Sequence, residues 1–188
     1  MSATSSNSPL LTREQILAAL ETLNRSLAER GVIGEVCLFG GAVMVLAFNA
    51  RLATKDVDAV FQPADTVRAL AKQVGDSKGL PAGWLNDGVK GYLSAKHDTT
   101  QGGLPQFDHL HLLMPTAEYL LAMKCLASRI SSGKGEADDT ADIVFLIRHL
   151  KLKNAEAVMD ILGAYYPPER IPVRARFLIE TLFEEGRV

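Results

Sequence analysis

The chain has 188 residues, of which 47% are apolar and 22% are charged, and its formal net charge is −2 at pH 7. This length allows one domain with a sizeable core, and the composition excludes disorder of the whole chain. The small net charge excludes a strongly basic nucleic-acid binder by bulk charge, although a local basic patch is compatible with it. The longest apolar runs fall short of the about 20 residues that a membrane span needs, so we expect no membrane partner.

The N-terminal segment and the cysteines indicate the compartment. Residues 1–11 are rich in serine and lack both a basic start and an apolar core, so they predict a flexible arm and not a signal peptide. Cys37 and Cys125 each lie in an apolar segment without a companion at metal-ligand spacing, which is typical of buried thiols. Together these features predict a cytoplasmic protein.

Hydrophobic periodicity predicts strands and helices in alternation, followed by helices alone. In chain order the predicted elements are helix 12–30, strand 35–39, helix 42–48, strand 56–61, helix 64–74, strand 107–114, helix 116–130, helix 139–150 and helical segments 154–164 and 169–184. Thr12 is a suitable N-cap for the first helix, and Gly31 a suitable stop. Residues 75–103 are rich in Gly, Asp, Asn and Lys and predict one helical turn or short strand and a mobile loop.

These elements group into three parts. The arm 1–11 precedes an α/β core over 12–115, and an all-helical region over 116–188 follows. The link between helices 116–130 and 139–150 is short, so we expect these two helices to pair as an antiparallel hairpin.

Two aspartates stand out on the second predicted strand. Asp56 and Asp58 are two positions apart, so their side chains share one face. Adjacent carboxylates repel each other unless a cation lies between them, and Mg²⁺ or Mn²⁺ takes such oxygen ligands together with phosphate oxygens. Asp108, on the third predicted strand, is the best-placed third ligand. The structural alternative is that Asp56 caps the turn after Lys55 while Asp58 is a solvated edge residue.

A double glycine precedes this pair. Gly40 and Gly41 join a strand to a helix, where exposed backbone N–H groups and the absence of a Cβ let a phosphate approach. A triphosphate held there and bridged by Mg²⁺ to Asp56 and Asp58 has the geometry needed for phosphoryl or nucleotidyl transfer. The structural alternative is that Gly41 allows the helix to pack closely on the strand.

The stretch FGGAVMVLAFNARLATKDVDAVF, residues 39–61, resembles the signature of the DNA polymerase beta-type nucleotidyltransferase superfamily. That signature is a hydrophobic residue and two small residues, about a dozen further positions, and then Asp-x-Asp between apolar residues. The resemblance implies a small mixed β-sheet core of the α/β (α+β) class with flanking helices and a C-terminal helical bundle. It also implies that Gly40 and Gly41 hold the phosphates and that Asp56 and Asp58 bind the metal ions.

Two later stretches extend the resemblance. PTAEYLLAMKCLASR (115–129) and ADDTADIVFLI (137–147) are similar to motifs of AbiEii-type nucleotidyltransferases, the toxins of some bacterial toxin–antitoxin systems. Lys124 and Arg129 match the first motif, and Asp139 and Asp142 match the second. The resemblance implies that Lys124, Arg129 and Asp139 bind the nucleotide, and that Lys124 and Asp142 join Asp56 and Asp58 in catalysis. It also implies an RNA acceptor such as a tRNA 3′ end, and a cognate antitoxin protein.

The residues themselves leave a structural alternative for Lys124. Its neighbours on the predicted helix are mostly apolar, and a buried ammonium there needs a partner. A triphosphate is one such partner. A Lys124–Asp142 pair or an Arg129–Asp139 pair that only fixes the helix hairpin is the other.

Other side chains carry weaker hypotheses. Trp84, the only tryptophan, could stack on a base, but the favoured interpretation is an anchor that holds its loop to the core. Lys55, Lys90, Lys96 and Arg51 flank the proposed site in sequence and could contact polynucleotide phosphate, although scattered basic residues are usually solvated surface.

The sequence therefore predicts a metal-dependent nucleotidyltransferase that uses a nucleoside triphosphate. Two alternatives remain open at this stage. One is a domain of the same fold without turnover that binds nucleotide or protein, and the other is a nucleotidyltransferase that modifies a small molecule such as an antibiotic.

Overall fold

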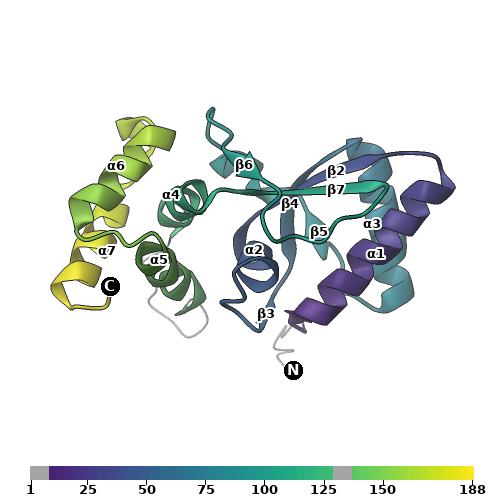
Figure 1. The fold of residues 1–188 in the computed structure, drawn as a ribbon, viewed down its shortest axis with the longest axis horizontal. Helices are drawn as coiled ribbons and strands as arrows, with labels where there is room; N and C mark the ends of the chain where they lie inside the picture. The colour runs from purple at the N-terminus through teal and green to yellow at the C-terminus, as the bar shows by residue number, and fades with distance from the viewer. Residues whose placement is uncertain (1–8, 129–136) are drawn as a thin grey trace, which may run out of the picture. The chain divides into compact units, whose positions relative to one another are not determined.

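The computed structural model describes residues 9–128 and 137–188. Over these residues the chain is a mixed α/β protein, as predicted (Figure 1). Its seven described α-helices are α1 (Arg13–Glu29), α2 (Gly40–Leu46), α3 (Ala64–Lys78), α4 (Ala117–Ala127), α5 (Ala137–His149), α6 (Ala155–Tyr165) and α7 (Val173–Glu184). Its described strands are β1 (Leu11–Thr12), β2 (Gly34–Leu38), β3 (Ala53–Thr54), β4 (Val57–Gln62), β5 (Leu85–Asn86), β6 (Thr99–Thr100) and β7 (Leu110–Pro115). Two short 3-10 helices are η1 (Gly88–Tyr92) and η2 (Pro168–Arg170).

The main sheet is mixed and has five described strands in the order β5-β4-β2-β7-β6. β2 runs antiparallel to β4 and parallel to β7, and β4 runs parallel to β5. A separate pair joins β1 to β3, with Leu11 level with Thr54. Leu11 is buried, so the last residue of the predicted flexible arm 1–11 belongs to the folded part of the chain. Residues 1–8 of that arm lie outside the described residues.

Local sequence signals explain the first helix. Thr12 caps α1 in a capping box with Gln15, and the buried face of the helix includes Ile16, Leu20, Leu23 and Leu27. The chain leaves the helix through Gly31, whose φ of 63° is the left-handed conformation that glycine adopts without strain. The predicted helix 12–30 is therefore confirmed.

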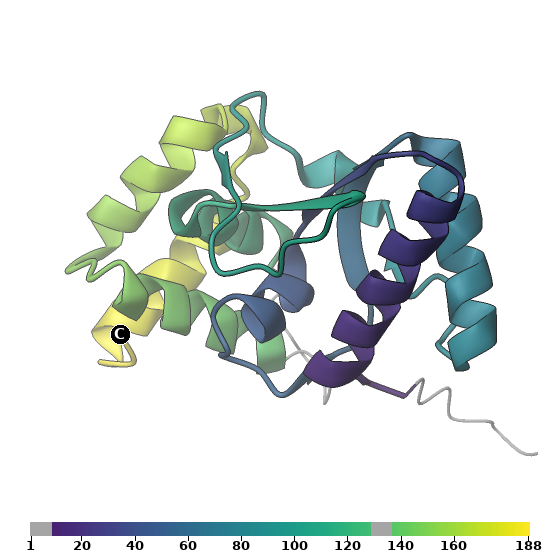
Figure 2. The ribbon, with the colours of Figure 1, turned by 45° about the vertical axis from the view of Figure 1, so that its right-hand side comes forward.

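The chain divides into two compact units, and the sheet unit consists of Met1–Val89 and Gln101–Met114. In it, α1 and α3 pack against each other, as both views show (Figures 1 and 2). The start of β2 lies close to both helices, because a Cβ added at Gly34 would stand 2.8 Å from Leu27 Cδ1 and 3.5 Å from Val67 Cγ2. α3 continues to Lys78, beyond the predicted end at residue 74, and stops at Gly79 in the left-handed conformation.

Trp84 anchors the loop that follows α3. Its side chain is 2% exposed, and its indole N–H donates a hydrogen bond of 2.8 Å to the Ala71 carbonyl. We expect Trp84→Phe to lower the free energy of unfolding by about 1–3 kcal/mol, because it removes this hydrogen bond and leaves a small cavity. Urea denaturation measures the change. The control Phe177→Leu alters a side chain that is 60% exposed and should stay within about 0.5 kcal/mol of the wild type.

The second unit consists of Lys90–Thr100 and Pro115–Val188. α4 packs on α5 and on α6, and α6 packs on α7; these are the green to yellow helices of Figure 2. The segment 90–100 was predicted as part of the core, but it is bound here by side chains distant in sequence. Tyr166 donates to the Tyr92 carbonyl at 2.6 Å, and Arg170 donates to the Gly91 and Leu93 carbonyls.

None of the described helices combines the length and the apolar character that crossing a bilayer requires.

Candidate functional site

The double glycine and the second aspartate, Asp58, lie close together where β2 ends and β4 begins. Because β2 and β4 are antiparallel, the end of β2 lies beside the start of β4, and the Phe39 N–H donates to the Asp58 carbonyl at 2.8 Å. Gly40 follows with a φ of 60°. A Cβ added at Gly40 would stand 3.0 Å from Asp58 Oδ2, so the backbone of the turn and the carboxylate are in close approach. α2 begins at Gly40, two residues earlier than predicted.

Asp56 and Asp58 share one face, as the alternation predicted. Val57 and Ala59 are buried on the opposite face, whereas both aspartates are half-buried. β4 begins at Val57, one residue later than predicted, so Asp56 stands immediately before the strand. The two carboxylates therefore lie on the same half-buried face.

Asn86 is a polar neighbour that the sequence interpretation missed. It lies level with Asp58 on the adjacent β5, and its Nδ2 donates to Asp56 Oδ2 at 3.2 Å. Burial raises the pKa of Asp56, while the hydrogen bond from Asn86 and the nearby Lys55 charge act in the opposite direction. A two-residue strand in a Gly-rich and Asn-rich region has no readable periodicity, so its register with β4 could not be predicted.

Gly41 has a different environment from Gly40. A Cβ added at Gly41 would collide with the Thr54 hydroxyl and would stand 3.4 Å from Arg51 Nη1. This close approach of α2 to β3 agrees with the packing alternative for Gly41. It also places the guanidinium of Arg51, a half-buried side chain, beside the double glycine.

Asp108 does not lie with the other two carboxylates. It is exposed and precedes β7, whose first residue Leu110 is level with Gly34 at the start of β2. Gly40 follows the other end of β2. At about 3.3 Å per residue, Leu110 is therefore roughly 20 Å from the glycine turn along the strand direction, and Asp108 lies beyond Leu110. The prediction that Asp108 is a third metal ligand is wrong, because Asp108 lies at the amino end of a parallel strand whose carboxyl end points to the site.

Lys124 forms two ion pairs within the helical unit. Its Nζ, on α4, lies 2.8 Å from Asp139 Oδ1 and 2.7 Å from Asp142 Oδ2, both on α5. The Lys124 and Asp142 side chains are 9% and 2% exposed, whereas Asp139 is 48% exposed. The predicted Lys124–Asp142 contact is therefore present, and Asp139 joins it. The other predicted pair, Arg129–Asp139, is not tested, because Arg129 lies outside the described residues.

The donor set of the sheet unit fits a magnesium ion. Among the residues that the structure describes, no cluster of three or more His, Cys, Asp or Glu side chains could hold a metal by itself. Mg²⁺ commonly takes one or two carboxylates and completes its shell with water and substrate phosphates. Asp58 offers one such carboxylate next to Gly40, and Asp56, two positions earlier, offers the other. A zinc-type site, which needs three or four protein ligands, would not be satisfied by this pair.

The thiols do not provide an alternative chemistry. Burial raises the pKa of both Cys37 and Cys125 to about 12, so neither carries a thiolate near neutral pH. Both are free cysteines; Cys125 is buried, as predicted, whereas Cys37 is half-buried.

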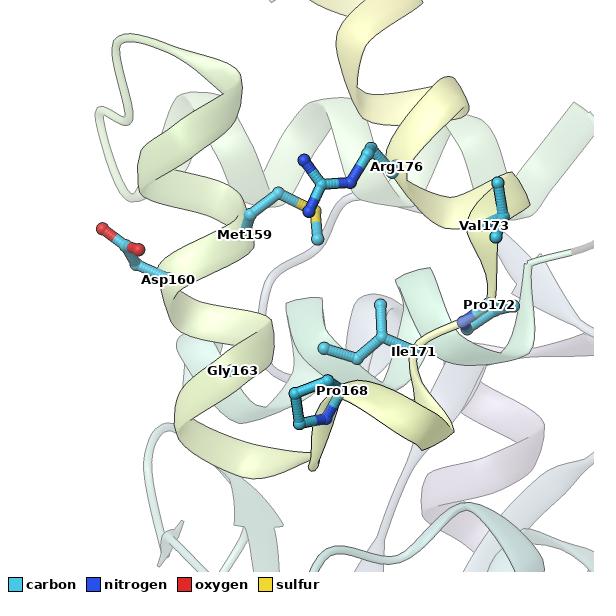
Figure 3. A pocket seen from close by; sticks show the side chains of 8 residues that line it. All are labelled: Met159, Asp160, Gly163, Pro168, Ile171, Pro172, Val173 and Arg176. Carbon is cyan, nitrogen blue, oxygen red and sulfur yellow. The ribbon is translucent and has the colours of Figure 1, made fainter.

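Each unit also has a pocket among its described residues. One of about 340 Å³ lies in the helical unit beside α6, η2 and α7, where the Arg176 guanidinium points toward Met159 and Asp160 points outward (Figure 3). The other, of about 430 Å³, lies beside α3 in the sheet unit and is lined by Arg68, Lys72, Asp76 and Trp84 among others. Of the predicted site residues that the structure describes, none lines either pocket.

Gly40→Ala tests the close approach at the turn. We expect a loss of about 1–2 kcal/mol in the free energy of unfolding, because an L-residue is strained in the left-handed conformation, and a weaker response to metal because the new Cβ meets Asp58. Gly31→Ala is the matched control, since Gly31 has a φ of 63° and nothing within 4 Å of an added Cβ. Urea denaturation with and without Mn²⁺ measures both variants. Equal metal stabilisation of the two variants would contradict a role of the Gly40 turn in metal or substrate binding.

Comparisons with protein-family models, with curated proteins and with solved structures gave no match for this chain. A function therefore rests on the geometry of these residues and on the resemblance of their motifs.

Proposed function

We propose that this chain is a metal-dependent nucleotidyltransferase that transfers a nucleotide from a nucleoside triphosphate to an acceptor hydroxyl. The observation that carries the proposal is the contact between the Gly40 turn and Asp58, with Asp56 on the same face. A turn without a Cβ admits a phosphate chain, and two carboxylates beside it suit a divalent cation that also binds phosphate oxygens. The motif resemblance supports the same assignment.

The reaction can be written from these groups. Mg²⁺ held by these residues would supply a positive charge that stabilises the negative charge developing on the phosphates. Asp56 and Asp58 hold the cation, and the Gly40 turn gives the phosphates room to approach. The acceptor oxygen forms a bond to the α-phosphorus, the bond from that phosphorus to the β-phosphate oxygen breaks, and pyrophosphate leaves. One of the two aspartates helps to remove the proton of the acceptor hydroxyl.

In this proposal the helical unit has a supporting part. Lys124 is held by Asp139 and Asp142, and a fixed ammonium can also position a substrate phosphate. The nucleotide-binding roles of Lys124, Arg129 and Asp139 and the catalytic role of Asp142 stay predictions from the resemblance.

The acceptor and partners are narrower proposals that rest on the resemblance alone. We expect an RNA acceptor, such as a tRNA 3′ end, and a cognate antitoxin protein, with a small-molecule acceptor as the alternative. We place the reaction in the cytoplasm, a compartment that keeps the free thiols of Cys37 and Cys125 reduced.

A second function, nucleotide binding without turnover, is favoured by a specific observation. Asp108, the predicted third carboxylate, lies at the far end of the sheet, which leaves two aspartates at the candidate site. Two carboxylates can bind a metal–nucleotide complex, whereas positioning two metals for transfer usually takes more ligands.

A transfer assay separates these functions. The full chain is incubated with Mg²⁺, each of the four labelled nucleoside triphosphates and total tRNA, and nucleotide binding is measured in parallel by calorimetry. Label transfer to RNA supports the proposed enzyme. Nucleotide binding without transfer to RNA or to small hydroxyl compounds supports the binding module. If the chain neither binds a nucleotide nor transfers the label, both functions are eliminated.

A further inference from the structure

Asn86 makes two hydrogen bonds that orient its amide. Its Oδ1 accepts from the Gly88 N–H at 2.9 Å, and its Nδ2 donates to Asp56 Oδ2 at 3.2 Å. A backbone N–H can bond only to the oxygen of the amide, so the first bond determines that the nitrogen faces Asp56. Asn86 therefore presents a donor to this carboxylate.

The short strand that carries Asn86 is fixed on both sides. Before it, the Trp84 carbonyl accepts from the Val57 N–H at 2.6 Å. After it, Asp87 pairs with Arg68 of α3, with Oδ2 and Nη2 3.0 Å apart. In the register of β4 with β5, Asn86 is level with Asp58. The amide is thus held at a defined position beside both aspartates.

We propose that Asn86 is a positioning residue for the metal-binding carboxylate of Asp56, an inference that rests on the proposed function of that site. A neutral amide can orient Asp56 by hydrogen bonding without adding a third negative charge beside two aspartates. Groups that orient metal ligands in this way contribute about 10–100-fold to metal affinity. Asn86 does not itself bind the metal in this arrangement, because its oxygen is directed to Gly88.

The test is a calorimetric titration of the full chain with Mn²⁺, without nucleotide. We expect Asn86→Ala to raise the dissociation constant about 10-fold relative to the wild type. The matched control is Asn24→Ala, because Asn24 is in the same unit and its Oδ1 accepts a single hydrogen bond of 2.9 Å from the His109 N–H, away from the aspartates. We expect the control to bind Mn²⁺ within about 2-fold of the wild type while losing stability similar to that of Asn86→Ala. Should Asn86→Ala fail to fold, Asn86→Ser replaces it, since the shorter hydroxyl cannot reach Asp56.

The outcomes are distinct. Weaker Mn²⁺ binding by the Asn86 variant but not by Asn24→Ala supports the positioning role. Equal binding by wild type and the Asn86 variant overturns that role and leaves the proposed function intact. An equal loss in both variants shows a general structural effect and also overturns it. A wild-type protein that binds no Mn²⁺ removes the metal site of the proposed function, and the role of Asn86 with it.

Discussion

Asp58→Asn should reduce nucleotide transfer by about 10³-fold while the protein remains folded. Asp58 is the carboxylate that lies against the Gly40 turn, so the substitution removes a charge at the point where metal and phosphate would meet. A neutral amide binds Mg²⁺ more weakly than a carboxylate and cannot take up the proton of an acceptor hydroxyl. The measurement is the initial rate of label transfer at saturating Mg²⁺, with thermal unfolding recorded on the same preparation.

Asp65→Asn is the control for this variant. Asp65 is in the same unit, its side chain is fully exposed, and it pairs only at the surface with Arg68. Its transfer rate should equal that of the wild type. Equal rates for Asp58→Asn and the wild type would refute the site assignment while leaving the activity itself standing.

Lys124→Met should lower the free energy of unfolding by about 3–5 kcal/mol. The ammonium of Lys124 forms ion pairs with both Asp139 and Asp142, and Asp142 is 2% exposed. Removal of one member of a buried pair leaves a charge in a medium that solvates it poorly, which costs far more than the pair itself contributes. Urea denaturation followed by circular dichroism measures the loss.

Lys72→Met tests the same substitution on a solvated pair. Lys72 contacts Asp76 at 2.7 Å, but their side chains are 75% and 68% exposed, so the expected loss is at most about 0.5 kcal/mol. The double variant Lys124→Met/Asp142→Leu should recover part of the stability, because it removes the buried charge as well. A loss below about 1 kcal/mol for Lys124→Met would contradict a structural role for the ion pairs.

The elements with strong periodicity or clear end signals were predicted well. α1 begins after the expected Thr12 cap and ends before Gly31, and β4 alternates buried and half-buried side chains as expected. The short elements were not placed: one helical turn or short strand was expected somewhere in residues 75–103, and β1 and β3 were not expected at all. β1, β3 and β5 have two residues each, too few for a hydrophobic period, and they exist because a partner strand satisfies their backbone groups.

The candidate site, too, was predicted only in part. The pairing of Gly40 with Asp58 was expected from a glycine turn and an Asp-x-Asp close in sequence, and both lie at one edge of the sheet. Asp108 was assigned to the site because its residue type fits and because it lies on the predicted strand 107–114. The direction and register of β7 were needed to place it, and both depend on contacts with β2, about 75 residues earlier in the chain.

By itself, the sequence determined the α/β class, the common face of Asp56 and Asp58, and the need of Lys124 for an anionic partner. These properties follow from backbone geometry and from the cost of burying charge, which act over a few residues. The tertiary structure alone decided that Asn86 reaches Asp56, that Asp108 does not join the site, and that Lys124 bonds to both Asp139 and Asp142. Each of these depends on which distant segments pair and in what register, and that choice is made by the packing of the whole chain.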